Sequence, residues 1–268
     1  MTPPRAVVLD MEGVLHVDWQ AIDGSAAAVE RLTAAGVGLA VLTNTTGRTR
    51  ADIAGRLAEM GMPIPADRIV TAASVAAEHL RRHHAGARVH ALVESAIAAE
   101  IEGVELVEDA AAAEVILLGG PDDRWTYPRL NAVFRRLVDG VPLVAMQRNR
   151  WWPTVDGPSL DAGAFVAGLE YATGIEAAVV GKPAPGIFEV ACELAGAPPG
   201  EAAMVGDDLE SDLRPARTLG MRIVLVRTGK GATFSPGPGD VDLDVADLEA
   251  AVDVLLGVEG QVELSDVE

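Results

Sequence analysis

Short apolar segments with the character of buried strands alternate with amphipathic helix patterns along most of this chain. The helix patterns at 25–35 and 49–60 both end at a glycine, the residue that most readily adopts the left-handed conformation at a helix end. Strands joined through helices of this length form right-handed crossovers and a mostly parallel sheet. The sequence therefore predicts an α/β fold. The predicted strands are 6–9, 37–42, 177–180, 203–205 and 223–226, and the predicted helices are 25–35, 49–60, 185–195 and 211–219.

A second alternating block lies between residues 74 and 175 and is long enough for an independent α/β module. We therefore predict a core of residues 1–73 and 177–258 and an inserted module of residues 74–176. The tail 259–268 is polar and acidic without periodicity, and we expect it to be disordered. The predicted strands of the module are 88–93, 115–118 and 143–145, and its predicted helices are 75–82, 127–138 and 161–171.

The charge and cysteine content exclude several classes of protein. The formal net charge of −19 argues against binding to nucleic acid or to an anionic membrane surface, since both need clustered cations. No apolar run approaches the roughly 18 residues of a membrane span, and no signal-peptide pattern precedes the first strand. The lone Cys192 excludes a disulfide framework and a cysteine metal site. We expect a cytoplasmic protein.

Polar side chains follow the predicted core strands at the points where they end. In an open α/β sheet, functional groups gather at the carboxyl ends of the strands. Lys182 is one of only two lysines beside nineteen arginines, which indicates a position that needs a compact point charge. If the strands are neighbours, we expect carboxylates, a hydroxyl, an amide and an ammonium to converge on one pocket. The residues are Asp10, Glu12, Thr43, Asn44, Lys182, Asp207, Asp208 and Asp212.

This set of groups suits phosphoryl transfer. Two aspartates from different strands make an all-oxygen site fit for Mg²⁺, which binds through one or two carboxylates and substrate phosphate. A lysine and a threonine can hold the remaining phosphoryl oxygens, and phosphoryl transfer needs mainly positioning and charge neutralisation. An aspartate that the metal does not fully occupy can attack phosphorus and form an aspartyl-phosphate.

The order of these motifs and the insertion after the second of them resemble the haloacid dehalogenase superfamily of phosphatases, in its branch with a large α/β cap. The resemblance covers roughly residues 6–257. It implies a Rossmann-like core that carries the chemistry and a cap, residues 74–176, that selects the substrate. Within this branch, the segments 43–45, 169–172, 180–183 and 204–208 are most similar to the phospholysine phosphohistidine inorganic pyrophosphate phosphatases and their uncharacterised relatives.

The resemblance assigns a role to each acidic residue. Asp10 would be the nucleophile and a Mg²⁺ ligand, the backbone carbonyl of Glu12 a second ligand, and Asp207 the third. Asp212 would anchor the metal ligands from behind, although an aspartate that opens a helix is also a common partner of the helix dipole. Asp208 would either assist or lie directly beside the metal.

The resemblance also assigns the groups that hold the phosphoryl oxygens. Thr43 would hydrogen-bond the transferring phosphoryl group, with assistance from the backbone of Asn44. Lys182 would neutralise charge on the aspartyl-phosphate and orient Asp10.

Glu12 departs from the superfamily pattern, which usually has an aspartate there as general acid and base. The extra methylene moves the carboxyl by about 1.5 Å, and a misplacement on that scale can lower a rate on the order of 100-fold. Two interpretations follow. Glu12 reaches the leaving oxygen through another rotamer, or the enzyme is slow or limited to good leaving groups such as a phosphoramidate or a phosphoanhydride.

The inserted cap carries the candidate substrate contacts. Asn149 and Asp161 stand in stretches that point at the active site in this branch, but Asp161 is equally suited to be a helix N-cap. The pair Trp151 and Trp152 would form either a substrate wall or internal packing of the cap or a dimer contact.

The sequence thus predicts a Mg²⁺-dependent phosphohydrolase for a small phosphorylated molecule, and the branch implies a homodimer through the cap. The alternative is a weakly active or inactive relative with a binding or regulatory role, because Glu12 replaces the usual aspartate. A transferase or a true dehalogenase is a third class, and the complete acidic motif at 207–212 argues against a dehalogenase, whose chemistry needs no metal.

Overall fold

The computed structural model describes residues 2–154, 157–233 and 235–257, and the side chains of residues 152–154 also lie outside the described part. The tail 259–268 and the Trp152 side chain lie outside the described part. The predicted disorder of the tail and the predicted role of Trp152 therefore stay predictions. No helix within the described ranges is long and apolar enough to cross a lipid bilayer.

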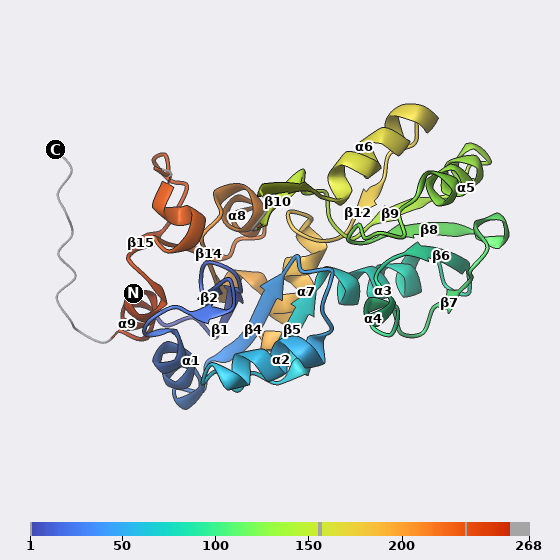
Figure 1. Cartoon of the computed structure of the whole chain (residues 1–268). Helices are drawn as coiled ribbons and strands as arrows, with labels where there is room; N and C mark the ends of the chain where they lie inside the picture. The colour runs from blue at the N-terminus through green and yellow to red at the C-terminus, as the bar shows by residue number, and fades with distance from the viewer. Residues whose placement is uncertain (1, 155–156, 234, 258–268) are drawn as a thin grey trace. The chain divides into compact units, whose positions relative to one another are not determined.

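Six strands form the first sheet, in the order β15 (Leu243–Val245), β14 (Arg222–Val226), β13 (Ala202–Gly206), β1 (Ala6–Asp10), β4 (Gly38–Thr43) and β5 (Ile69–Thr71) (Figure 1). The strands β1, β13, β14 and β15 pair with one another in parallel. Every residue of β1 and β13 is buried, as expected of central strands that are covered on both faces. The predicted strands at 6–9, 37–42, 203–205 and 223–226 are confirmed.

Five strands form the second sheet, in the order β12 (Ala178–Val179), β9 (Leu143–Ala145), β8 (Val115–Leu118), β6 (Arg88–Leu92) and β7 (Glu105–Leu106). All four of its pairings are parallel. The prediction that the strand near 177–180 belongs to the core sheet is wrong. This strand lies at the edge of the second sheet, because Ala178 pairs with Val144 and Val179 pairs with Ala145.

Nine α-helices occur among the described residues, and all but the last, α9, lie between strands along the chain. The helices α5 and α6 pack on one face of the second sheet, where Ile116 and Leu118 of β8 face Val133 and Val166 in one apolar cluster. The helices are α1 (Ser25–Ala34), α2 (Arg50–Glu59), α3 (Ala72–His83), α4 (Ser95–Ala98), α5 (Tyr127–Val138), α6 (Ala162–Thr173), α7 (Pro185–Ala195), α8 (Arg214–Thr218) and α9 (Leu248–Leu256).

Three further features bear on the site. Two antiparallel hairpins are formed by β2 (His16–Val17) with β3 (Gln20–Ala21) and by β10 (Trp151–Thr154) with β11 (Gly157–Leu160). A five-residue π-helix, Leu209–Leu213, precedes α8, so the helix predicted at 211–219 is divided in two. The α/β fold class and the mostly parallel sheets are confirmed.

Contacts divide the chain into two compact units, residues 1–41, 56–64 and 191–268, and residues 42–55 and 65–190. The first unit holds β1, β13 and β14, and the second holds the whole five-stranded sheet. The functional division into a core of residues 1–73 and 177–258 and a cap of residues 74–176 stays a prediction.

The start of α3 provides a test of how local hydrogen bonds stabilise the fold. The Thr71 hydroxyl accepts from the Ser74 N–H and the Ser74 hydroxyl accepts from the Thr71 N–H, a reciprocal capping box with Thr71 fully buried. We expect Thr71→Ala to lower the free energy of unfolding by about 0.5–2 kcal/mol, as measured by urea unfolding.

The matched control is Thr33→Ala in α1. The Thr33 hydroxyl bonds back to the Val29 carbonyl on an exposed helix face, and alanine has the higher helix propensity there. We expect the control to be neutral or slightly stabilising. Equal losses of unfolding free energy in Thr71→Ala and Thr33→Ala would contradict a stabilising role of the capping box.

Candidate active site

Three buried carboxylates from two neighbouring strands and a helix meet in the first unit. Asp10 is the last residue of β1, and Asp207 directly follows β13, which pairs with β1 in parallel. Asp212 lies in the π-helix and is fully buried. One oxygen of each carboxylate lies within 4.8 Å of the others. The structure thus brings together three of the acidic residues that the sequence singled out.

This cluster has the composition of a site for a divalent cation. Buried carboxylates at such short separations repel one another, and a protein holds them together by protonation or by a cation. Three carboxylate oxygens form a hard donor set of the kind that Mg²⁺ prefers. Asp10, Asp207 and Asp212 are therefore the residues whose side chains fit Mg²⁺. The resemblance gave Asp212 the role of supporting the metal ligands without binding the metal. In the structure its carboxylate is a member of the cluster itself.

The Glu12 side chain is held by the β2–β3 hairpin. One oxygen of its carboxylate accepts from the Asp18 N–H at 2.9 Å, and the other lies 3.0 Å from Nδ1 of His16. Burial, the largest effect, raises the pKa of Glu12, but the hydrogen bonds from His16 and Asp18 and the charges of His16 and Lys230 outweigh it. The pKa of Glu12 is thus lowered, which favours the carboxylate over the proton-donating acid.

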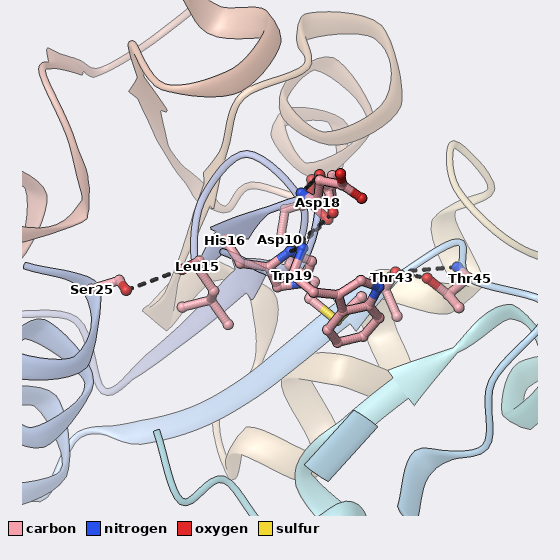
Figure 2. Close-up of polar contacts among 10 residues, drawn as sticks. Asp10, Leu15, His16, Asp18, Trp19, Ser25, Thr43 and Thr45 are labelled. Atoms are coloured by element: carbon pink, nitrogen blue, oxygen red, sulfur yellow. Dashed lines mark hydrogen bonds and ion pairs between the residues drawn. The ribbon is translucent and has the colours of Figure 1, made fainter. Parts of the chain in front are cut away.

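His16 and Trp19 form the body of this hairpin. His16 is fully buried and stacks on Trp19, with ring centroids 4.5 Å apart (Figure 2). The Arg56 guanidinium lies 4.9 Å from the centre of the Trp19 ring, a cation–π geometry. Asp18 and Trp19 both have positive φ angles, 49° and 58°, as a tight two-residue hairpin turn requires. Sequence reasoning did not assign His16 a role, because its pairing with Glu12 depends on this turn.

In the second unit, Thr43 ends β4 and forms a compact turn with Thr45. The two hydroxyls lie 2.9 Å apart, and the Thr43 hydroxyl also accepts from the Thr45 N–H at 3.1 Å (Figure 2). Thr43 is buried. These bonds fix the rotamer of the hydroxyl that the sequence assigned to phosphoryl binding.

The Asn44 side chain holds the backbone of Lys182. Its amide nitrogen donates to the Lys182 carbonyl at 2.9 Å, and its amide oxygen accepts from the Lys182 N–H at 2.7 Å. Lys182 itself is 6% exposed. The sequence predicted that the Asn44 amide lies in the pocket, and the resemblance gave its backbone the role of assisting Thr43. In the structure the Asn44 side chain holds the main chain of Lys182.

The second sheet fixes the chain that leads into Lys182. The N–H groups of Val180 and Gly181 donate to the carbonyls of Ala145 and Met146 at 3.0 and 2.9 Å. The expectation that Lys182 follows a strand of the same sheet as Asp10 is therefore wrong, because β12 pairs with β9. Lys182 is instead held between the extension of β9 and the Asn44 side chain.

Asp208 serves the start of the π-helix. One of its carboxylate oxygens accepts from the N–H groups of Glu210 and Ser211, both at 3.0 Å, and the other accepts from Nζ of Lys230 at 2.7 Å. Burial, the largest effect, raises the pKa of Asp208, but these bonds and the Lys230 charge outweigh it, so that its pKa is lowered. Asp208 is thus an ionised cap of the helix that carries Asp212.

The candidate substrate residues of the inserted block have internal partners. Asp161 is the N-cap of α6, where its carboxylate accepts from the Ala162 N–H and from the Gln147 amide. The Asn149 N–H donates to the Gln147 side chain. The N-cap interpretation of Asp161 is confirmed, and substrate contact by Asp161 and Asn149 stays a prediction. Trp151 is 56% exposed.

Known hydrolases resemble this chain in sequence. Residues 7–107 match the family model described as haloacid dehalogenase-like hydrolase, and residues 179–247 match a second model for HAD-like hydrolases. The phospholysine phosphohistidine inorganic pyrophosphate phosphatase of Xenopus laevis is 38% identical over 94% of each chain. The human haloacid dehalogenase-like hydrolase domain-containing protein 2 is 36% identical over 84% of this chain and 85% of its own.

Solved structures of phosphatases share the fold. The p-nitrophenyl phosphatase of Archaeoglobus fulgidus has a TM-score of 0.86 and is 25% identical, covering 94% of this chain and 99% of its own. The 4-nitrophenylphosphatase of Thermotoga maritima has a TM-score of 0.85 and is 27% identical, covering 94% of this chain and 97% of its own. The chain belongs to the haloacid dehalogenase-like hydrolases, and it is an enzyme of the phosphatase type within them.

The Asn44 bonds lead to a prediction about the lysine that they position. We expect Asn44→Ala to lower kcat for p-nitrophenyl phosphate by about 10- to 100-fold, because Lys182 is a predicted catalytic group and small displacements of such a group are costly. Asn44→Asp keeps the oxygen that accepts from the Lys182 N–H but loses the N–H group that donates to the Lys182 carbonyl. We therefore expect its kcat to lie between those of the unaltered enzyme and Asn44→Ala.

The measurement is steady-state kinetics, with Asn131→Ala in α5 as the control for the same substitution at a distant, partly buried position. Unchanged kcat in Asn44→Ala would show that Lys182 does not depend on this amide.

Proposed function

We propose that this chain is a Mg²⁺-dependent phosphohydrolase that acts on a small phosphorylated molecule through an aspartyl-phosphate on Asp10. The observation that carries the proposal is the cluster of Asp10, Asp207 and Asp212, three buried carboxylates with oxygens within 4.8 Å of one another. Mg²⁺, when bound there, would neutralise negative charge that otherwise keeps a carboxylate from approaching a phosphate.

The first step is attack by a carboxylate oxygen of Asp10 on phosphorus. The new bond joins Asp10 to phosphorus, and the bond from phosphorus to the leaving group breaks, with the electron pair going to the leaving group. Lys182 and Thr43 hold the phosphoryl oxygens by charge and by a hydrogen bond. In the second step a water attacks phosphorus, inorganic phosphate leaves, and the Asp10 carboxylate is restored.

Glu12 points to the class of substrate. Both oxygens of the Glu12 carboxylate are engaged within the hairpin, by the Asp18 N–H and by Nδ1 of His16, and this engagement hinders proton donation to a leaving group. The same carboxylate can accept a proton from the attacking water. We therefore favour substrates whose leaving groups need little protonation, phosphoanhydrides and phosphoramidates, a preference supported by the names of the relatives. Phosphoric monoesters with good leaving groups would also be substrates.

The inserted residues 74–176 would act as the cap that selects the substrate, with Asn149 and Asp161 as its candidate contacts. A homodimer through this cap and a cytoplasmic location complete the proposal. The second candidate is a weakly active or inactive binding protein, and the engagement of both Glu12 oxygens within the hairpin is the observation that favours it.

Asp10→Asn tests the nucleophile. We expect phosphate release from p-nitrophenyl phosphate, acetyl phosphate, pyrophosphate and a phosphoramidate to require Mg²⁺ in the unaltered enzyme. In Asp10→Asn we expect release to fall at least about 10³-fold, because the amide cannot form the covalent intermediate. Asp67→Asn, at an exposed position, is the matched control. A folded, unaltered protein that hydrolyses none of the four compounds would favour the binding protein.

Glu12 leads to a prediction about leaving groups. With a series of aryl phosphates, we expect kcat/KM to fall steeply as the leaving group becomes more basic, because Glu12 donates a proton poorly. Glu12→Asp restores the residue usual in the superfamily, and we expect it to flatten this dependence. A shallow dependence in the unaltered enzyme would show instead that Glu12 is a competent general acid.

A further inference from the structure

The loop that follows β14 contacts the carboxylate of Asp207. The backbone N–H of Lys230 donates to Oδ2 of Asp207 at 2.7 Å, which makes this oxygen part of a fixed hydrogen bond. Asp207 is 4% exposed, so the bond is shielded from solvent and from competing water. A main-chain donor on a loop after β14 thus orients a carboxylate of the metal cluster.

Two glycines shape the space in which this carboxylate lies. A Cβ atom on Gly13 would lie 2.1 Å from Oδ2 of Asp207, and a Cβ atom on Gly229 would lie 2.2 Å from the same oxygen. Both separations are far below contact distance. Both residues also have positive φ angles, 82° and 56°, which glycine adopts without cost. The carboxylate therefore fits closely between the two chain segments.

Side chains anchor the loop at both ends. The Thr228 hydroxyl donates to the carbonyl of Gly13, which ties the loop to the segment after Asp10. At the other end, Nζ of Lys230 donates to Asp208 at 2.7 Å. Lys230 thus bridges the loop, through its N–H to Asp207 and through its ammonium to Asp208, two adjacent residues of the acidic motif.

We propose that the loop of residues 228–231 is a positioning element of the metal site, which fixes the orientation of the Asp207 carboxylate and so would favour its binding of Mg²⁺. Lys230 and Thr228 act through Asp207 and are positioning residues. The inference rests on the proposed function for the identity of the metal. Partners of this kind orient metal ligands, and their loss typically weakens metal affinity by about 10- to 100-fold.

A purely electrostatic role for Lys230 predicts the opposite result. Its ammonium is a positive charge beside the acidic cluster, and removing a like charge from the neighbourhood of a cation site strengthens cation binding. Positioning and electrostatics thus predict changes of opposite sign in Mg²⁺ affinity when Lys230 loses its charge.

The experiment measures Mg²⁺ binding by isothermal titration calorimetry on the full chain without substrate. We expect the Kd for Mg²⁺ to rise about 10- to 100-fold in Lys230→Met, and Lys230→Arg to restore part of the loss. Thr228→Val removes the bond to Gly13 at nearly constant volume, and we expect a rise in Kd of the same sign. Arg222→Met, on β14 and bonded to the distant Thr2 carbonyl, is the control.

Unchanged or tighter binding in both Lys230→Met and Thr228→Val would overturn the proposal. Circular dichroism identifies a variant that fails to fold, and the other variant then decides. Phosphate release by the unaltered enzyme separates this inference from the proposed function. If the unaltered protein releases no phosphate and both variants bind Mg²⁺ more weakly, the loop's role is supported and the phosphatase is rejected. If the unaltered protein is active and both variants bind Mg²⁺ as it does, only the loop's role is rejected.

Discussion

Repulsion among three buried carboxylates is the constraint on which the site depends. Asp10, Asp207 and Asp212 each offer one carboxylate oxygen, these oxygens lie within 4.8 Å of one another, and their negative charges repel. The parallel pairing of β1 with β13 enforces the approach of Asp10 and Asp207, and the large buried area of the central strands stabilises that pairing. The fold thus holds in place a charge arrangement that favours binding of a divalent cation.

Hydrogen bonds that involve the main chain position a candidate functional residue in each of the two units. The Lys230 N–H fixes Asp207 in the first unit, and the Asn44 amide fixes the backbone of Lys182 in the second. The first bond fixes an oxygen of the Asp207 carboxylate directly, and the Asn44 bonds fix the main chain that carries the Lys182 side chain. Such preorganisation lowers the reorganisation needed in the transition state.

The sequence predicted the parts of this arrangement that follow from periodicity. Asp10 and Asp207 directly follow apolar strands, so their place at the carboxyl edge of a parallel sheet was predictable. The assignment of β12 was not, because a two-residue strand can extend either sheet and only pairing with β9 decides. The bonds of Asn44 to Lys182 and of Glu12 to His16 were also unpredictable, since one joins residues far apart in the chain and the other depends on the hairpin turn.

In the proposed reaction, Asp10 forms a covalent bond to phosphorus during turnover. The most direct measurement is to quench the enzyme with acid while it turns over acetyl phosphate, reduce it with borohydride, and analyse its peptides by mass spectrometry. Borohydride converts an aspartyl-phosphate to homoserine and leaves a free carboxylate unchanged. We expect Mg²⁺-dependent conversion at position 10. Turnover without conversion there, or with conversion at another carboxylate, would contradict it.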